Sequence, residues 1–169
     1  LLELAKKYDV IILEDNPYGD LRFDGDDVPT IKSLDTDGRV IYVGSFSKIL
    51  SPGMRLGFAV ANEEIISKIE IAKQANDVHT PLITQMMAAE FLKNNDIEEY
   101  IEKGKELYGR KCRFMLECMD KYFPDSVTYT RPQGGIFIWC TAPEGTDSNK
   151  LLAECLKEKV AFVAGHSFA

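Results

Sequence analysis

Three short apolar runs within the first sixty residues constrain the fold of this chain most strongly. They are Val10–Leu13, Val40–Val43 and Leu56–Val60, and polar segments separate them. Continuous apolar runs of this length are typical of strands that are buried on both faces, as in a parallel sheet. Helical spacing of apolar residues over 1–8 precedes the first run. The pattern therefore predicts an α/β sheet that is covered on both faces.

The remainder of the chain divides into a helical middle and a mixed last third. Asn62 is a suitable N-cap for a helix from Glu63, and a second helix is expected from Thr80-Pro81 to about residue 92. A long helix is predicted over 97–122. Short strands at 127–130, 136–140 and 160–163, a turn at 132–135 and a helix at 149–157 indicate a small α+β domain. We expect two domains, 1–100 and 101–169, with the long helix leading into the second.

Composition and charge exclude several classes of function. The net charge of −7 argues against a nucleic-acid-binding surface, which requires clustered Lys and Arg. No apolar run approaches the ~20 residues that span a bilayer. The two histidines are too far apart to predict a metal site. The cysteines form no CxxC pair and predict reduced thiols in a cytoplasmic protein; they are Cys112, Cys118, Cys140 and Cys155.

Two residues with reactive side chains follow predicted strands. Asp15 follows the first apolar run and Lys48 follows the second. In open α/β sheets, ligands bind at the carboxyl ends of the strands. Lys48 shares its loop with Ser45, Ser47 and Arg55, and hydroxyl groups with a guanidinium are suited to hold a phosphate. The loop alone is also compatible with a solvated basic surface.

The combination of Asp15 with Lys48 favours a pyridoxal-phosphate (PLP) site. An aspartate at a strand end, taken by itself, is more often a helix cap or a turn former. A pyridoxal ring, however, needs a lysine to hold it and a carboxylate to keep its ring nitrogen protonated. Tyr18, three residues after Asp15, has a phenol that can hydrogen-bond to the 3-oxygen of the ring. The three residues together predict a cofactor site.

The segments Asp15–Tyr18 and Ser45–Gly57 resemble the core of class I/II aminotransferases of PLP fold type I. They are most similar to the branch that contains 2-aminoadipate and aromatic aminotransferases and the aminotransferase-like domains of MocR-type regulators. Arg131–Trp139 resembles the small-domain hairpin of this family, and Val160–Phe168 resembles a later segment, with Ala164 where the family usually has proline. The resemblance covers essentially the whole chain.

The resemblance implies a fold, a reaction and a role for each site residue. It implies a mixed, mostly parallel sheet of the PLP large domain, followed by a small α+β domain. Lys48 would hold PLP as a Schiff base and shuttle the substrate proton, Asp15 would pair with the ring nitrogen, and Tyr18 would contact the 3-oxygen. The phosphate would be bound by Ser45, Ser47 and Arg55. The substrates would be an amino acid and a 2-oxo acid, and the full-length protein would be a homodimer.

The resemblance also implies that this chain is a fragment. The family's arginine for the substrate carboxylate would lie beyond Ala169, and the earlier half of the large domain would lie before Leu1. We therefore expect the chain alone to be catalytically incompetent.

Three alternatives to an aminotransferase remain. Ser45–Lys48 matches the S-x-x-K pattern of penicillin-binding enzymes, but the companion motifs S-D-N and K-T-G are absent from the sequence. A MocR-type regulator would use a similar domain to sense a ligand. A PLP-dependent C–S lyase would use the same Asp15, Lys48 and Arg55.

Overall fold

The computed structural model describes residues 1–168. Their contacts form two compact units. The first unit comprises residues 1–115 together with Pro132–Ile136, and the second comprises Leu116–Arg131 and the residues from Phe137 onward. The two domains expected from the sequence, divided near residue 100, remain a prediction.

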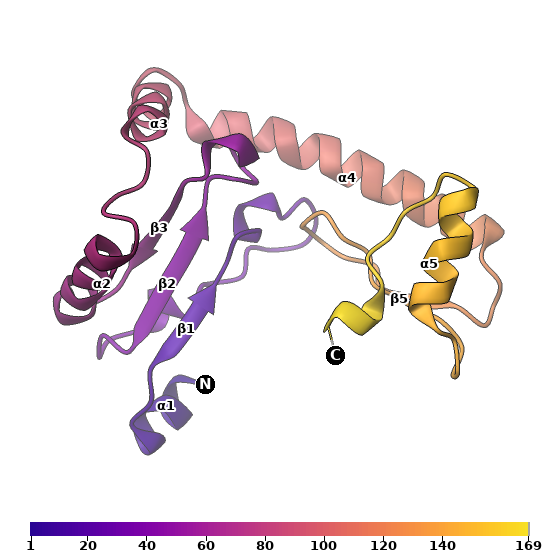
Figure 1. Ribbon diagram of the computed structural model, residues 1–169, viewed down its shortest axis with the longest axis horizontal. Helices are drawn as coiled ribbons and strands as arrows, with labels where there is room; N and C mark the ends of the chain where they lie inside the picture. The colour runs from indigo at the N-terminus through magenta and orange to yellow at the C-terminus, as the bar shows by residue number, and fades with distance from the viewer. Residues whose placement is uncertain (169) are drawn as a thin grey trace. The chain divides into compact units, whose positions relative to one another are not determined.

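A three-stranded mixed sheet lies at the centre of the first unit. Its strands β1 (Ile12–Asp15), β2 (Val40–Ser45) and β3 (Gly57–Val60) run side by side with β2 in the middle (Figure 1). β1 and β2 are parallel, whereas β2 and β3 are antiparallel. The connection from β2 to β3 contains only turns and the short 3-10 helix Pro52–Met54, whereas a parallel return would need a crossover of a dozen or more residues. The α/β class with a mixed sheet is therefore confirmed, with one parallel pair and one antiparallel pair.

The first strand differs from its prediction in position and in burial. β1 begins at Ile12, two residues after the start of the apolar run at Val10. The side chains of Ile11 and Leu13 are 57% and 65% exposed, because no segment within residues 1–168 covers them. The prediction that the sheet is covered on both faces is thus wrong for this chain. Val40, at the start of the central strand, is fully buried.

The α-helices over residues 1–122 agree closely with the sequence pattern. They are α1 (Leu2–Tyr8), α2 (Glu63–Asn76), α3 (Leu82–Asn94) and α4 (Ile97–Tyr122). Asn62 caps α2 as predicted, since its Oδ1 accepts a hydrogen bond of 2.9 Å from the Ile65 N–H. No helix among the described residues is long and apolar enough to cross a membrane. All four cysteines are free thiols.

The second unit contains the end of α4, a strand pair and one further helix. The strands β4 (Thr128–Tyr129) and β5 (Cys140–Thr141) are antiparallel and shorter than predicted, and α5 (Ser148–Lys157) follows them. The strand predicted at 160–163 is wrong, because this segment is irregular. Its first N–H is already engaged, since Val160 donates to the carbonyl of Cys155 and closes the end of α5. A short 3-10 helix covers Gly165–Phe168.

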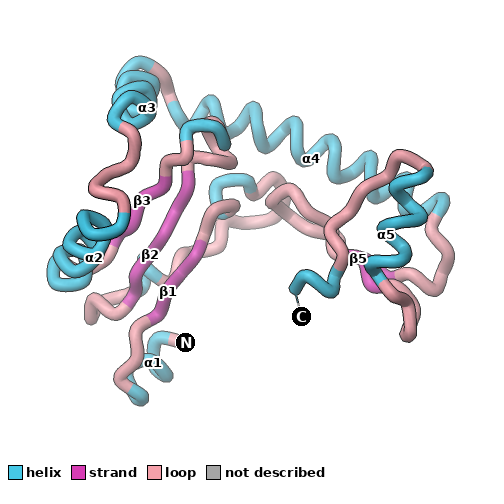
Figure 2. Tube along the Cα trace, in the orientation of Figure 1, coloured by secondary structure: helices cyan, strands magenta, loops and turns pink. Residues whose placement is uncertain are grey.

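The segment Pro132–Ile136 pairs with the loop that follows β1. This loop and the turns within it join β1 to β2 (Figure 2). The Phe23 and Asp24 N–H groups donate to the Gln133 carbonyl, and the Gly135 N–H donates to the carbonyl of Leu21. Leu21 is almost completely buried. The turn predicted at 132–135 therefore belongs to the first unit, which the sequence pattern does not reveal.

Close backbone approach at Gly134 predicts a large cost for any side chain at this position. A Cβ atom on Gly134 would lie 2.9 Å from the Arg22 Cα and 3.0 Å from the Leu21 carbonyl oxygen, both of them backbone atoms. We expect Gly134→Ala to lower the free energy of unfolding by about 1–3 kcal/mol through overpacking. Denaturant unfolding of the full-length protein measures this change.

Gly104 provides the matched control. It lies within α4, and apart from its chain neighbours and the nearby backbone of the same helix no atom lies within 4 Å of a Cβ added there. Gly104→Ala should raise the free energy of unfolding by about 0.5–1 kcal/mol, because alanine has the higher helix propensity. Equal effects of the two substitutions would contradict the close packing of Gly134 against the backbone of Leu21 and Arg22.

Candidate functional site

Lys48 lies in a tight turn directly after the central strand. The N–H groups of Leu50 and Ser51 both donate to the carbonyl of Phe46, at 2.8 and 3.0 Å. These bonds close a single helix-like turn around Lys48 and keep it close to the end of β2. The side chain of Lys48 is half-buried. It therefore occupies the position at the carboxyl edge of the sheet that the sequence predicts.

The Lys48 and Tyr18 side chains are brought together in the structure. The Nζ atom of Lys48 lies 5.7 Å from the centre of the Tyr18 ring, within the range of a cation–π contact. Tyr18 is half-buried and immediately precedes the 3-10 turn Gly19–Leu21 after β1. The two residues thus come from loops that follow neighbouring parallel strands. This places the predicted lysine and the predicted phenol at one site.

Asp15 is the last residue of β1 and lies next to the same strand edge. It is opposite Val43 in the parallel register, and the following Asn16 N–H donates to the Val43 carbonyl at 3.0 Å. The Asp15 side chain is exposed. Within residues 1–168 no hydrogen bond or ion pair engages its carboxylate. The carboxylate is therefore available to a ligand.

Of the three predicted phosphate-binding residues, two are hydrogen-bonded to each other and the third is not bonded to either. Ser45 Oγ accepts from the Ser47 N–H at 3.1 Å and lies 3.4 Å from the Leu56 carbonyl, to which it donates. Arg55 is exposed, and its guanidinium donates to the Pro52 carbonyl at 3.2 Å. Its backbone φ of 53° lies in the left-handed region, which is uncommon for residues other than glycine. Such strain often marks a functional loop.

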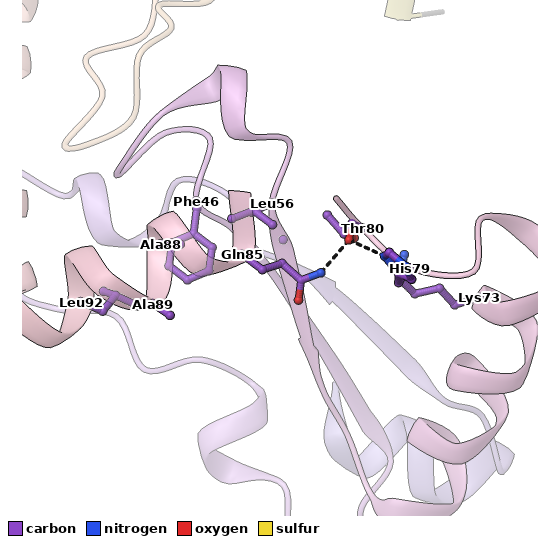
Figure 3. Close-up of a pocket in the computed structure, with 10 residues that line it drawn as sticks. Phe46, Leu56, Lys73, His79, Thr80, Gln85, Ala88, Ala89 and Leu92 are labelled. Atoms are coloured by element: carbon purple, nitrogen blue, oxygen red, sulfur yellow. Dashed lines mark hydrogen bonds between the residues drawn. The ribbon is translucent and has the colours of Figure 1, made fainter. Parts of the chain in front are cut away.

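A pocket of about 440 Å³ lies behind the Lys48 loop, between that loop and helix α3. Phe46 and Leu56 face Ala88 and Leu92 across its apolar part (Figure 3). Two of the polar side chains that line it are already engaged. Gln85 Nε2 donates to the Thr80 carbonyl at 2.7 Å, and Lys73 is paired with Asp77. The pocket therefore offers an apolar wall that supports the Lys48 loop.

The remaining residues singled out in the sequence take structural positions. His79 lies in the connection between α2 and α3, where its Nδ1 is 2.9 Å from the Thr80 carbonyl. His166 belongs to the second unit, and its N–H donates to Ser148 Oγ. Gly134 approaches the backbone of Leu21–Arg22 instead of open space.

Sequence reasoning missed the polar residues that flank Asp15. The Glu14 carboxylate accepts two backbone N–H groups, and the Asn16 side chain reaches the hydroxyl of Tyr42. A signal was present, because Glu14 is a charged residue inside a short strand and needs a partner there. The apolar pattern alone gave no indication of which groups would supply it.

Comparisons with known proteins identify the family of this chain. The family model of class I and II aminotransferases matches residues 1–169. Aromatic-amino-acid aminotransferase 1 of Thermococcus litoralis is 45% identical over 168 residues, which are 99% of this chain and 40% of the relative. The structure of LysN, an α-aminoadipate aminotransferase of Thermus thermophilus complexed with N-(5′-phosphopyridoxyl)-L-leucine, is 39% identical. It superposes with a TM-score of 0.92 over 97% of this chain and 43% of that protein.

A regulator is also among the relatives. The HTH-type transcriptional regulator NorG of Staphylococcus aureus is 31% identical over 169 residues, which are 99% of this chain and 38% of the regulator. The chain therefore spans about two fifths of the length of the relatives it matches. The fold class and the family resemblance found in the sequence are both confirmed. From the match over its full length and the shared fold, the chain belongs to the class I and II aminotransferases.

Proposed function

We propose that the protein containing this chain is a PLP-dependent aminotransferase that transfers an amino group between an amino acid and a 2-oxo acid. The observation that carries this proposal is the contact of the Lys48 ammonium with the Tyr18 ring, beside the unengaged carboxylate of Asp15. The relatives named above as aminotransferases support it.

The residues at this strand edge fit the cofactor. Asp15 has a carboxylate without a partner within residues 1–168, which suits a protonated ring nitrogen. Tyr18 offers a phenol for the 3-oxygen, within reach of the lysine. Arg55 is exposed, with donors beyond its one bond to Pro52 that can serve a phosphate. The two hydroxyls of the same loop, Ser45 and Ser47, complete the proposed set.

The proposed mechanism divides the work between the cofactor and the chain. When bound, PLP supplies an electron sink for the negative charge that develops at the substrate α-carbon. Lys48 Nζ would be the amine that holds the cofactor, and the same amine would accept the proton from the substrate α-carbon and return a proton to the substrate. Asp15 would stabilise the positive charge on the ring nitrogen. The turn closed on the Phe46 carbonyl keeps Lys48 at the strand edge.

The names of the relatives suggest the substrate class and the setting. The T. litoralis enzyme is named for aromatic amino acids and the T. thermophilus enzyme for α-aminoadipate. We propose that one of these classes is the amino donor here. We further propose that the full-length protein is a homodimer in the cytoplasm. We also propose that this segment does not bind nucleic acid. Because the chain spans about two fifths of its relatives, the activity is proposed for the full-length protein.

The test is direct on the full-length protein. It should be purified with a visible absorbance band that borohydride reduction removes, and peptide mass mapping should then place a phosphopyridoxyl group on Lys48. Amino transfer to a 2-oxo acid should follow with an aromatic amino acid or α-aminoadipate. Absence of bound PLP from protein refolded with excess cofactor would refute the proposal. Formation of pyruvate and ammonia from cystathionine without an acceptor would show a C–S lyase instead.

A ligand-sensing regulator is the second candidate, because NorG matches the same 99% of the chain. Such a protein would hold PLP at Lys48 but would show no multiple turnover with any amino donor. It would also shift a promoter DNA fragment in a mobility assay. The two measurements on the full-length protein separate the candidates.

A further inference from the structure

The orientation of the Asp15 carboxylate depends on its backbone. No side chain or backbone group within residues 1–168 binds this carboxylate. Its position is therefore set by the end of β1, which consists of four residues. A short strand of this kind frays easily unless neighbouring residues hold it. The residues on both sides of Asp15 are anchored.

Glu14 supplies the stronger of the two anchors. Its Oε1 accepts from the Ile31 N–H and its Oε2 accepts from the Lys32 N–H, each at 2.8 Å. These are donors at the start of the 3-10 turn Lys32–Leu34, so the carboxylate caps this turn from a distant strand. Because side chains alternate along a strand, Glu14 points to the face opposite Asp15. Hydrogen bonds to an ionised acceptor are among the stronger ones in proteins.

The turn that Glu14 holds is itself joined to the central strand. Lys32 Nζ donates to the Val40 carbonyl at 2.9 Å and pairs with Asp35 at 3.1 Å. Asp35 accepts the Val40 and Arg39 N–H groups at 2.9 and 3.1 Å. Burial would raise the pKa of Asp35, but these backbone bonds and Lys32 hold it well below its usual value. Glu14 is thus connected through an ionised network to the first residue of β2.

Asn16 provides the second anchor on the other side of Asp15. Its Nδ2 donates to the hydroxyl of Tyr42 in β2 at 3.3 Å, and its backbone N–H donates to the Val43 carbonyl. Asp15 therefore lies between two residues that each bind β2 or the turn preceding it. Its own side chain remains unengaged on the opposite face.

From this arrangement we propose that Glu14 is a positioning residue for Asp15. Its two hydrogen bonds hold the last residues of β1 in place and so aim the Asp15 carboxylate at the ring nitrogen of PLP. The inference rests on the proposed function, since it assigns Asp15 to that nitrogen. Glu14 itself touches neither substrate nor cofactor.

The test replaces Glu14 by glutamine in the full-length protein. Glutamine has the same length but only one acceptor oxygen, so its amide N–H₂ would face a backbone donor. We expect the dissociation constant of PLP to rise about tenfold, equivalent to the loss of one such interaction. The pH midpoint of the cofactor's visible absorbance should also shift by about half a unit or more, because a misplaced Asp15 supports the ring charge less well.

Asp147 supplies the matched control. Its carboxylate likewise accepts two backbone N–H groups, those of Asn149 and Lys150, but at the start of α5 in the second unit. Asp147→Asn should lower thermal stability as Glu14→Gln does, without moving the absorbance midpoint. A Glu14→Gln protein with wild-type PLP affinity and a wild-type pH midpoint of absorbance would overturn the role of Glu14 but leave the proposed function intact. A wild-type protein without bound PLP would overturn the proposed function instead.

Discussion

Lys48→Ala is expected to abolish the covalent attachment of PLP and to reduce amino transfer by roughly 10³-fold or more. The structure gives the reason, because Lys48 is the amine at the carboxyl edge of the sheet, held in a closed turn and in contact with Tyr18. Under the proposed function, its loss removes both the group that would hold the cofactor and the group that would move the substrate proton. Borohydride labelling and steady-state kinetics of the full-length protein measure the two losses separately.

Two further lysine variants make this prediction specific. Lys48→Arg keeps a positive charge over the Tyr18 ring, but a guanidinium remains protonated and cannot act as a nucleophile. It should therefore be as inactive as the alanine variant. Lys68→Ala removes an exposed lysine from α2 and should retain wild-type activity. Labelling of Lys48→Ala at wild-type level would show that another residue holds the cofactor.

Local sequence signals determine how much of the fold could be predicted. The helix over 97–122 was predicted with both ends correct, since a polar break precedes it and Pro124 follows it. The cap at Asn62 was equally readable. The pairing of segments that are far apart in the sequence could not be predicted in this way. The strand predicted at 160–163 has no partner among the described residues, and an apolar run forms a strand only where another strand accepts its hydrogen bonds.

The candidate site shows the same division between local and distant information. Asp15 and Lys48 could be proposed as site residues because each follows an apolar run, and Tyr18 could be proposed because it lies near Asp15 in the sequence. The bonds of Glu14 with Ile31 and Lys32, and the pairing of Gly134 with Arg22, join residues far apart in the chain. The spacing of apolar residues along the sequence does not indicate such contacts. Supporting interactions are therefore what the structure adds to a site located by sequence.

Asp15→Asn is expected to lower the rate of amino transfer by roughly 10³-fold, while PLP remains attached to Lys48. Asparagine keeps the shape of the side chain but removes its charge. The attraction between unit charges about 4 Å apart is about 4 kcal/mol at an effective dielectric constant near 20, which corresponds to this factor in rate. The loss should appear in kcat, because the ring charge is needed most when the substrate proton leaves.

Asp20→Asn is the control that distinguishes the loss of a negative charge at the site from the loss of a negative charge elsewhere on the loop. Asp20 is an exposed carboxylate in the 3-10 turn after Tyr18, so this substitution makes the same chemical change five residues away. This variant should keep wild-type kcat. Asp15→Glu restores the charge on a longer side chain and should recover part of the activity. If Asp15→Asn retained wild-type kcat, the ring charge would depend on another residue, and the role of Glu14 would lose its basis.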